Sequence, residues 1–320
     1  MAARSSSIVR RALLYVPSSS EKMLTKSLSL KTDNVTYDLE DSVTPALKSQ
    51  ARVQLRSFLS NHSSRPPFIS EIAVRVNAVE TKFALDDLTS LGSLPNVDAV
   101  VVPKVNSAAD LTYVTDVLRH VAPERHTFGS PNPVKIIALI ESARAVMNLS
   151  EICKASPYLS GLIFAAEDFA LDLSLTRTPS LTEFLYARSA IVTAAKAFNL
   201  PSAIDLVCTS YKGEEGLRRL KEESLGGKSM GFNGKQCIHP SQVPLVQKLF
   251  APGEKEVEWA VRVAIADEKA NAAGRGAWTL DGMMIDAPVT GKARAIIAKA
   301  EKCDIDVERL RTKWRDQEPE

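Results

Sequence analysis

The chain has 320 residues, 45% of them hydrophobic, which suits one large α/β domain with an extension. Its 40 basic and 38 acidic residues give a formal net charge of +2 without any basic block, which argues against a nucleic-acid partner. No apolar stretch is long enough to span a membrane, and the four cysteines are widely scattered. We therefore expect a soluble intracellular protein without a membrane partner, whose thiols are reduced and mostly buried.

The N-terminal segment has a composition of its own. Residues 1–20 contain Arg4, Arg10 and Arg11 and several serines, and no acidic residue precedes Glu21. This composition is typical of a mitochondrial presequence, although the first predicted strand already begins near Arg11. We assign residues 1–10 to a leader or disordered segment and expect a mitochondrial or cytoplasmic location.

Eight short runs, mostly apolar, follow one another along the chain and alternate with helical patterns. The runs are Ala12–Val16, Val35–Leu39, Ile72–Val76, Ala99–Val102, Ile136–Ile140, Leu162–Ala166, Ala203–Val207 and, more weakly, Cys237–Ile238. Apolar runs without alternation are typical of parallel strands buried on both faces. The repeated unit predicts a (β/α)₈ TIM barrel over residues 11–250. A doubly wound open sheet is the alternative, but its usual glycine-rich first turn is missing from Pro17-Ser-Ser-Ser20.

Residues 251–320 follow the eighth unit and are not needed to close a barrel. Val257, Val261, Ala264 and Ile265 share one face of a predicted helix, and Gly274 and Gly276 could form a hinge after it. We expect these residues to form a C-terminal helical extension with a capping segment.

Two of the strand runs are followed by carboxylates. Glu141 comes directly after Ile136–Ile140, and Asp168 comes shortly after the run that begins at Gly161. The carboxyl ends of barrel strands gather on one rim, so these two acids could converge on one Mg²⁺ ion, which takes one or two carboxylates plus water and substrate. The alternative is that each acid caps the helix that follows it. Because two such carboxylates follow strands of the same predicted barrel, we favour a shared metal site over helix capping.

Other charged residues also follow the strand runs. The second run is followed by Glu40 and Asp41, the third contains Arg75, the fourth precedes Lys104 and the seventh contains Asp205. In a TIM barrel, the carboxyl ends of the strands carry the functional groups. So many charges at one rim are hard to explain by solvation alone.

Seven motifs make the chain resemble the citrate lyase β-subunit-like branch of the HpcH/HpaI aldolase superfamily. They are Leu13-Leu-Tyr-Val-Pro17, Tyr37-Asp-Leu-Glu-Asp-Ser-Val43, Val74-Arg-Val-Asn77, Val101-Val-Pro-Lys-Val105, Leu139-Ile-Glu-Ser-Ala143, Phe164-Ala-Ala-Glu-Asp168 and Gly231-Phe-Asn-Gly-Lys-Gln-Cys-Ile-His-Pro240. The resemblance implies a TIM barrel, Mg²⁺ dependence and acyl-CoA carbon–carbon lyase or condensation chemistry. Within the branch, the chain is most similar to stand-alone citramalyl-CoA and malyl-CoA lyases. Its Trp278–Pro288 segment resembles their extension, which caps the active site of a neighbouring subunit.

The resemblance also implies roles for individual residues. Glu141 and Asp168 are the implied Mg²⁺ ligands. Arg75 would donate hydrogen bonds to the enolate oxygen, and a structural ion pair with Glu40 or Asp41 is its alternative or additional role. Glu40 and Asp41 would hold metal-bound water and orient Arg75.

Asp286 is the candidate acid/base that the resemblance favours. It follows the apolar stretch Met283–Ile285, so desolvation could raise its pKa into a useful range. The alternative is an N-cap for a helix that begins near Pro288. Asp281 is the competing candidate.

Four further residues stand near the predicted rim. Lys22 and Lys235 are candidate contacts for coenzyme A phosphates, against the alternatives of a solvated lysine and a buried ion pair respectively. Lys104 is expected to pair with Asp38 or Glu40 rather than to act as a nucleophile, and His239 is expected to be structural.

These observations predict a Mg²⁺-dependent lyase that cleaves a β-hydroxyacyl-CoA of the citramalyl-CoA or malyl-CoA type. The products would be acetyl-CoA and an α-keto acid, pyruvate or glyoxylate, and the reverse condensation remains open. The alternatives are the citryl-carrier β-subunit of a citrate lyase complex and a non-catalytic barrel protein. We expect a homo-oligomer, a trimer or a multiple of one.

Overall fold

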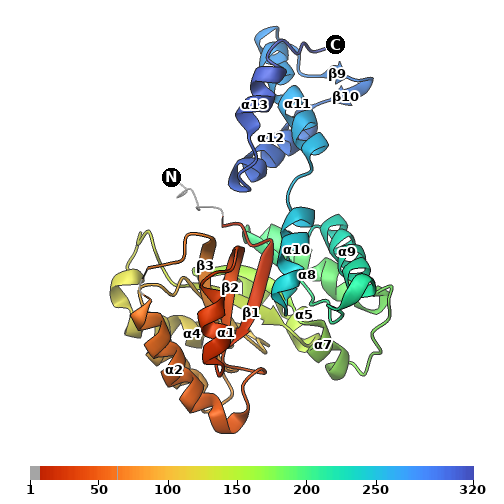
Figure 1. The fold of residues 1–320 in the computed structure, drawn as a ribbon. Coiled ribbons are helices and arrows are strands. Elements are labelled where there is room, and N and C mark those ends of the chain that lie inside the picture. The colour runs from red at the N-terminus through yellow and green to blue at the C-terminus, as the bar shows by residue number, and fades with distance from the viewer. Residues whose placement is uncertain (1–7, 63) are drawn as a thin grey trace. The chain divides into compact units, whose positions relative to one another are not determined.

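The computed structural model describes residues 8–62 and 64–320, and its first part is a closed barrel of eight parallel strands (Figure 1). The strands are β1 (Ala12–Pro17), β2 (Thr32–Asp38), β3 (Ile69–Arg75), β4 (Ala99–Val102), β5 (Lys135–Ile140), β6 (Leu159–Phe164), β7 (Ser202–Asp205) and β8 (Gly234–Cys237). Each strand pairs with the next, and β8 closes the ring against β1, with Leu13 opposite Gln236. The predicted (β/α)₈ barrel is therefore confirmed, and the open sheet is excluded.

Helices connect and surround the strands. They are α1 (Glu21–Ser27), α2 (Lys48–Asn61), α3 (Ala84–Leu91), α4 (Ala108–Val121), α5 (Ala143–Met147), α6 (Leu149–Lys154), α7 (Ala166–Asp172), α8 (Leu185–Ala197), α9 (Gly213–Met230) and α10 (Val243–Phe250). Short 3₁₀ turns lie at Pro45–Leu47, Pro123–Arg125, Thr182–Phe184 and Pro240–Gln242. On α4, Leu111, Val114 and Leu118 share one face of the helix and are buried.

The barrel interior is filled by apolar side chains that point inward from the strands. Leu13, Ala73, Ala99, Val101, Ile137, Leu139, Ile163 and Ile204 form one buried cluster. Tyr15 and Ala165 pack against this cluster. Because alternate residues of a strand share one face, Tyr15 lies beyond Leu13 towards the carboxyl end of β1. The top of the core therefore forms the floor on which a site at that end is built.

A buried ion pair fills the opposite end of the barrel. The Arg10 guanidinium donates to both carboxylate oxygens of Glu71 at 2.6 and 2.7 Å, and also to Ser160 and Ser202. Arg10 precedes the first strand, which begins at Ala12, and its side chain is only 2% exposed. The predicted boundary between leader and barrel at residues 10 and 11 stays a prediction. Residues 1–7 of the predicted leader lie outside the described residues.

The chain divides into two compact units, the second of which is Lys248–Glu320. This unit contains α11 (Glu254–Ala272), β9 (Trp278–Leu280), β10 (Met283–Ile285), α12 (Ala287–Lys302) and α13 (Val307–Lys313). It has a core of its own, to which α11, the β9–β10 hairpin, α12 and α13 all contribute. Asp281 and Gly282 both have positive φ, as the two central residues of a tight hairpin turn require.

The thiols are as the sequence predicts. Cys153, Cys208 and Cys237 are free thiols, and all three are buried. Within residues 8–62 and 64–320, none of the helices combines the length and the apolar character that crossing a bilayer would need.

The Arg10–Glu71 pair generates a stability prediction. Arg10→Met should destabilise the barrel by about 3–5 kcal/mol, because removing one partner leaves the other charge buried and uncompensated. Burial alone would raise the pKa of the Glu71 carboxyl, but Arg10 holds that pKa below its usual value. Urea unfolding followed by circular dichroism measures the loss, with the exposed Arg218→Met as the matched control. Equal midpoints for the two variants would contradict a structural role for the pair.

Candidate active site

A cavity of about 190 Å³ lies where the carboxyl ends of several strands meet. Tyr15 of β1, Arg75 of β3, Leu139 of β5 and Gln236 of β8 all line it, together with Asp168 from the first turn of α7. These residues are far apart in the sequence, and the closed barrel brings them together. The rim at which we predicted the functional residues therefore contains a cavity.

Arg75 is held rigidly at the edge of this cavity. Its Nε and Nη2 atoms each donate to one carboxylate oxygen of Asp38 at 2.7 Å, and its Nη1 lies 2.9 Å from Glu40. The guanidinium also lies over the Tyr15 ring, 4.6 Å from its centre. We expected Glu40 or Asp41 as the partner of Arg75, but Asp38 is the bidentate partner. Asp38 and Arg75 are register neighbours at the ends of β2 and β3, a relationship visible only once the strands are paired.

Glu40 is the second anchor of this network. It is 5% exposed, and its Oε1 accepts a 2.6 Å hydrogen bond from Lys104, the pairing that the sequence predicts. Asp41 is much more exposed and lies 3.6 Å from Arg75 Nη1. Burial raises the pKa of the Glu40 carboxyl even though Arg75 opposes the shift.

Glu141 and Asp168 do not cap the helices that follow them. Ser142 caps α5 by accepting from the Ala145 amide, and none of the described side chains caps α7. Glu141 lies at the end of β5 and is 6% exposed. Burial, followed by repulsion from Asp168 and Glu40, raises the pKa of Glu141 to about 8. The two carboxylates are therefore close enough to repel each other across the rim.

This carboxylate cluster fits a divalent cation. Glu40 Oε2 faces Arg75 Nη1 but accepts no hydrogen bond of good geometry from the described residues, and Glu141 has two acidic neighbours. Within the described residues, no group of three or more His, Cys, Asp or Glu side chains is arranged to hold a metal. Mg²⁺ does not need such a cage, because it keeps several waters and uses one or two carboxylates. Glu141 and Asp168 match that donor set.

Tyr15 and Gln236 also line the cavity with polar groups, and neither was among the predicted site residues. Tyr15 donates to Gln236 Oε1 at 3.0 Å, and Gln236 Nε2 donates to the carbonyl oxygens of Phe164 and Asp205. The Asp205 side chain itself bonds to Arg188 and is fully buried. Asp205 therefore belongs to the barrel wall and not to the cavity, contrary to the expectation for strand-end charges.

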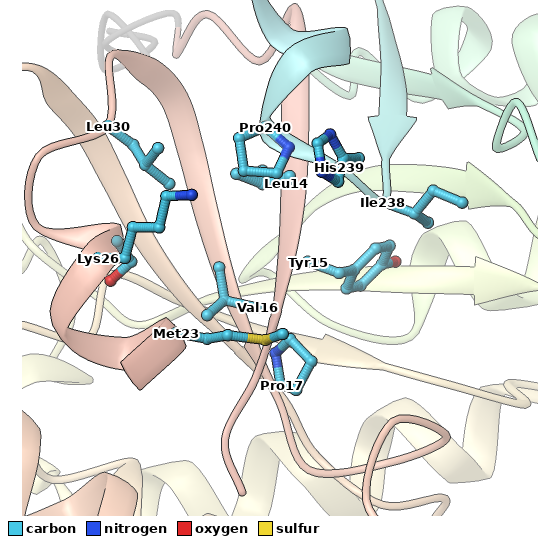
Figure 2. A pocket seen from close by; sticks show the side chains of 11 residues that line it. Leu14, Tyr15, Val16, Pro17, Met23, Lys26, Leu30, Ile238, His239 and Pro240 are labelled. Carbon is cyan, nitrogen blue, oxygen red and sulfur yellow. The ribbon is translucent and has the colours of Figure 1, made fainter. Parts of the chain in front are cut away.

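A second cavity of about 200 Å³ adjoins the first, since Tyr15 and Ile238 line both. It lies between the β1–α1 segment and the residues that follow β8. In Figure 2, Met23 and Lys26 lie on the α1 side, and Ile238 and His239 lie on the opposite side. Most of the lining is apolar, and Lys26 is the one lysine or arginine among the described residues that form it. The two cavities together could receive an elongated ligand.

Lys22 and Lys235, the two predicted contacts for coenzyme A phosphates, have different surroundings. Lys22 is exposed on α1 but does not line the second cavity, whereas Lys26, one turn later, does; the role of Lys22 stays a prediction. Lys235 is fully buried and lies 3.2 Å from Glu223 of α9. That position contradicts a phosphate contact and fits the alternative of a buried ion pair. A lysine near the end of a strand looks the same in the sequence in either role.

His239 has structural partners, as expected. Its ring stacks on Tyr211 with centroids 5.0 Å apart, and its Nδ1 lies 2.7 Å from the Ser241 hydroxyl.

Asp286 takes the position that its alternative predicts. It is the N-cap of α12 and accepts a 3.2 Å hydrogen bond from the Val289 amide, with Pro288 in the first turn. Asp281 is bound bidentately by Arg262 at 2.7 Å, which lowers the pKa of Asp281. A paired and exposed Asp281 is a poor acid/base, so Asp286 remains the candidate, and its catalytic role stays a prediction.

Comparisons with known proteins agree with this geometry. The chain is 36% identical over 294 residues to the citrate lyase subunit beta of Haemophilus influenzae, covering 91% of this chain and 97% of that protein. It is 34% identical over 302 residues to the human mitochondrial citramalyl-CoA lyase, covering 92% and 86%. The structure of the CitE protein of Mycobacterium tuberculosis in complex with magnesium, acetoacetate and coenzyme A matches with a TM-score of 0.71, at 30% identity, covering 92% of this chain and 98% of that one.

The family profile for HpcH/HpaI aldolase/citrate lyase matches residues 11–240, from the first strand to the end of the barrel sheet. Both relatives are named as lyases, and the name of the human relative includes citramalyl-CoA. The fold, the rim of carboxylates and these matches lead to one conclusion: the chain belongs to the HpcH/HpaI aldolase/citrate lyase family.

Proposed function

We propose that the protein is a Mg²⁺-dependent lyase that cleaves a β-hydroxyacyl-CoA, such as citramalyl-CoA or malyl-CoA, into acetyl-CoA and an α-keto acid. The observation that carries this proposal is the rim cavity, because Asp168 and Arg75 both line it. A carboxylate pair suits a metal that holds the keto-acid half, and a fixed arginine suits the charge that develops on the thioester half.

The reaction makes three demands on the site. The hydroxyl group must lose a proton, the bond between the hydroxyl carbon and the adjacent CH₂ carbon must break, and its electron pair must be held as a thioester enolate until a proton reaches the CH₂ carbon. When bound by Glu141 and Asp168, Mg²⁺ would supply Lewis-acid stabilisation of the keto-acid oxygens. Arg75 has N–H groups left over from Asp38 and Glu40 to donate to the enolate oxygen.

The network around Arg75 prepares it for this role. Asp38 fixes the plane of the guanidinium through two parallel hydrogen bonds, and Tyr15 covers one face of it. A donor that is already oriented does not have to reorganise when negative charge develops on the substrate. The neighbouring carboxylates also keep Arg75 charged, because Asp38 raises the pKa of the guanidinium above its usual value against the effect of burial.

The second cavity is proposed to hold the coenzyme A arm. Its apolar walls suit the pantetheine chain, and Lys26 offers a cation for a phosphate. Tyr15 and Ile238, which line both cavities, would lie beside the thioester where the arm enters the rim cavity. Lys22 remains a candidate phosphate contact.

The citryl-carrier β-subunit of a citrate lyase complex is the second candidate, favoured by the similarity to the Haemophilus influenzae subunit. The site machinery would be shared, and the thioester carrier would differ. The charged residues at the rim argue against a non-catalytic barrel. Placing the carboxylates of Glu141 and Asp168 close together beside Arg75 costs electrostatic free energy, and such clusters are typical of functional sites.

We further propose a homo-oligomer, a trimer or a multiple of one, in which Asp286 acts as acid/base in a neighbouring subunit's site. The β9–β10 hairpin presents Met283 and Met284 at 67% and 71% exposure beside Asp286. An exposed methionine pair next to a candidate acid supports a segment that closes over another surface. The proposed location is mitochondrial or cytoplasmic.

The metal assignment predicts loss of turnover on substitution. Glu141→Ala and Asp168→Ala should each abolish acetyl-CoA release from citramalyl-CoA and malyl-CoA at millimolar Mg²⁺ and lose Mg²⁺ binding in calorimetry, because one carboxylate is left to hold the ion. Circular dichroism should be unchanged. Glu151→Ala, on an exposed residue of α6, is the control and should behave as wild type. Near-wild-type activity of either rim variant at low Mg²⁺ would refute the assignment.

The oxyanion role predicts that Arg75→Lys loses about 10²–10³-fold in kcat, because an ammonium cannot reproduce the planar fork. The thermal unfolding midpoint of the same sample should also be measured. Lysine has one ammonium group in place of the guanidinium, so the variant would also lose one of the two hydrogen bonds to Asp38. A variant that is slowed only a few-fold, whatever its midpoint, would indicate that Arg75 is mainly structural.

Delivery of Asp286 between subunits predicts complementation. Inactive Asp286→Ala protomers mixed with inactive Glu141→Ala protomers should regain part of the activity, because a mixed pair of neighbours can assemble one intact site. Glu141→Ala mixed with Asp168→Ala is the matched control and should stay inactive, since both lesions lie in the same barrel. Absence of rescue after verified subunit exchange would argue that Asp286 acts within its own subunit or not at all.

A further inference from the structure

Glu141 belongs to a very short connection. β5 ends at Ile140 and α5 begins at Ala143, so Glu141 and Ser142 are the whole link between them. In a link of two residues, the direction of the Glu141 side chain depends on what holds the residues that follow it. Ser142 and Ala143 are each hydrogen-bonded to a different neighbouring element.

The first of these bonds ties Ser142 to the turn between β4 and α4. The Ser142 hydroxyl donates to Asn106 Oδ1 at 2.6 Å. Asn106 is itself held by three further bonds. Its backbone N–H donates to Asp110 at 2.8 Å and its side-chain amide to the Lys104 carbonyl oxygen at 3.2 Å, and its carbonyl oxygen accepts from the Asn148 side chain at 2.8 Å. The partner of Ser142 is therefore fixed in its turn.

The same turn faces two of the acids at the rim. Lys104 has a φ of 53°, a left-handed conformation that a residue with a side chain keeps only where the surrounding structure fixes it. Its ammonium group bonds to Glu40 at 2.6 Å. Burial raises the pKa of Glu141, and the backbone N–H group of Lys104 opposes that rise. The bond from Asn106 to the Lys104 carbonyl oxygen thus stabilises a turn that faces both acids.

The second bond ties Ala143 to α7. The Ala143 backbone N–H donates to Asp172 Oδ2 at 2.8 Å. Ala143 is the first residue of α5, so this N–H group has no acceptor within its own helix. α7 carries Asp168 in its first turn and Asp172 four residues later, on the same face. One hydrogen bond therefore connects the helix that carries Asp168 with the segment that carries Glu141.

We propose that Asn106 and Asp172 are positioning residues for the candidate metal site. They hold residues 142–143 from two sides and so set the distance between the Glu141 and Asp168 carboxylates before a cation binds. This inference rests on the proposed metal site and goes beyond it, because neither positioning residue lines the rim cavity. Two neighbouring carboxylates repel each other and would otherwise turn apart. A pair that is already in place binds the ion without the cost of ordering its ligands.

A pair of substitutions at Asp172 separates position from charge. Asp172→Ala removes the hydrogen-bond acceptor and the negative charge, whereas Asp172→Asn keeps an acceptor oxygen and removes the charge alone. In calorimetric titrations with Mg²⁺ alone, we expect Asp172→Ala to bind about tenfold more weakly than wild type and Asp172→Asn within about threefold of it. Asp116→Ala, which changes an exposed acid of α4, is the control and should bind as wild type. Equal weakening in both Asp172 variants would overturn the positioning role in favour of a long-range charge effect.

A double-mutant cycle tests the bond between Asn106 and Ser142. Asn106→Ala and Ser142→Ala should each weaken Mg²⁺ binding by about tenfold, and the double variant should lie within about threefold of the weaker single variant, because both substitutions remove the same hydrogen bond. Independent losses that multiply to about a hundredfold would contradict the proposed role of that bond. Thermal midpoints of metal-free samples verify that each variant is folded. If an Asn106 variant does not fold, the Asp172 pair still decides, because Asp172 is exposed on α7.

The Mg²⁺ dependence of turnover separates this role from a catalytic one. With citramalyl-CoA, Asp172→Ala should need about tenfold more Mg²⁺ for half-maximal turnover and should recover a kcat within about threefold of wild type at saturation. Loss of kcat at an unchanged Mg²⁺ requirement would refute the positioning role. Weaker Mg²⁺ binding by Asp172→Ala in a protein that cleaves no thioester would contradict the lyase and support the positioning role. A wild-type protein that binds no Mg²⁺ would remove the metal site and this inference together.

Discussion

Closure of the parallel barrel is the constraint on which the site depends. The pairing of β1 with β8 forces all eight carboxyl ends onto one rim, so that residues as distant as Tyr15 and Gln236 come into hydrogen-bond contact. Carboxylates that would be solvated on an open chain are brought together and partly buried there. The raised pKa of Glu141, caused by burial and by Asp168 and Glu40, is the electrostatic result of that crowding. A divalent cation is the simplest group to relieve it.

The two ends of the barrel use charge in different ways. At the amino ends of the strands, Arg10 and Glu71 neutralise each other inside a hydrogen-bonded network that also includes Asn34, Ser160 and Ser202. At the carboxyl ends, the described acids outnumber their partners, and Glu141 is buried beside two other carboxylates. The first end contributes stability, and the second holds excess negative charge that a ligand can use. This difference agrees with the general division of labour in TIM barrels.

The sequence predicted all eight strands, because parallel strands buried on both faces are mostly apolar. Their bounds were less certain where polar residues are buried. β2 starts at Thr32 rather than at Val35, since Asp33 binds Arg11 and Asn34 binds Glu71 in the barrel floor. The polar strand Gly234–Cys237 gave only a weak pattern for a similar reason: Lys235 pairs with Glu223, and Gln236 with Tyr15. A buried polar residue whose hydrogen bonds are satisfied interrupts the apolar run from which a buried strand is predicted.

The site was predictable to the extent that each residue acts through its position on the rim. Glu40, Glu141 and Asp168 follow apolar runs directly or nearly so, and Arg75 lies within one. The barrel fold places all four at the rim. Contacts between residues on different elements were not predictable. The bidentate ion pair of Asp38 with Arg75 depends on the register of β2 and β3. The buried ion pair of Lys235 depends on the packing of α9, which carries Glu223. Asp286 is the N-cap of α12, and the family resemblance also implies that it is the acid/base. Its position in the sequence therefore does not distinguish a capping role from a catalytic one.

The central claim is that Glu141 and Asp168 hold one divalent cation beside Arg75. A crystal structure of the protein grown with Mn²⁺ and pyruvate tests it directly, because Mn²⁺ takes the same oxygen ligands as Mg²⁺ and gives an anomalous signal. We expect one anomalous peak at the rim, bonded to a carboxylate oxygen of each of the two residues at about 2.0–2.3 Å, with pyruvate on the same ion. A peak that touches neither Glu141 nor Asp168, or a rim without a peak at saturating Mn²⁺, would contradict a cation site formed by these two residues.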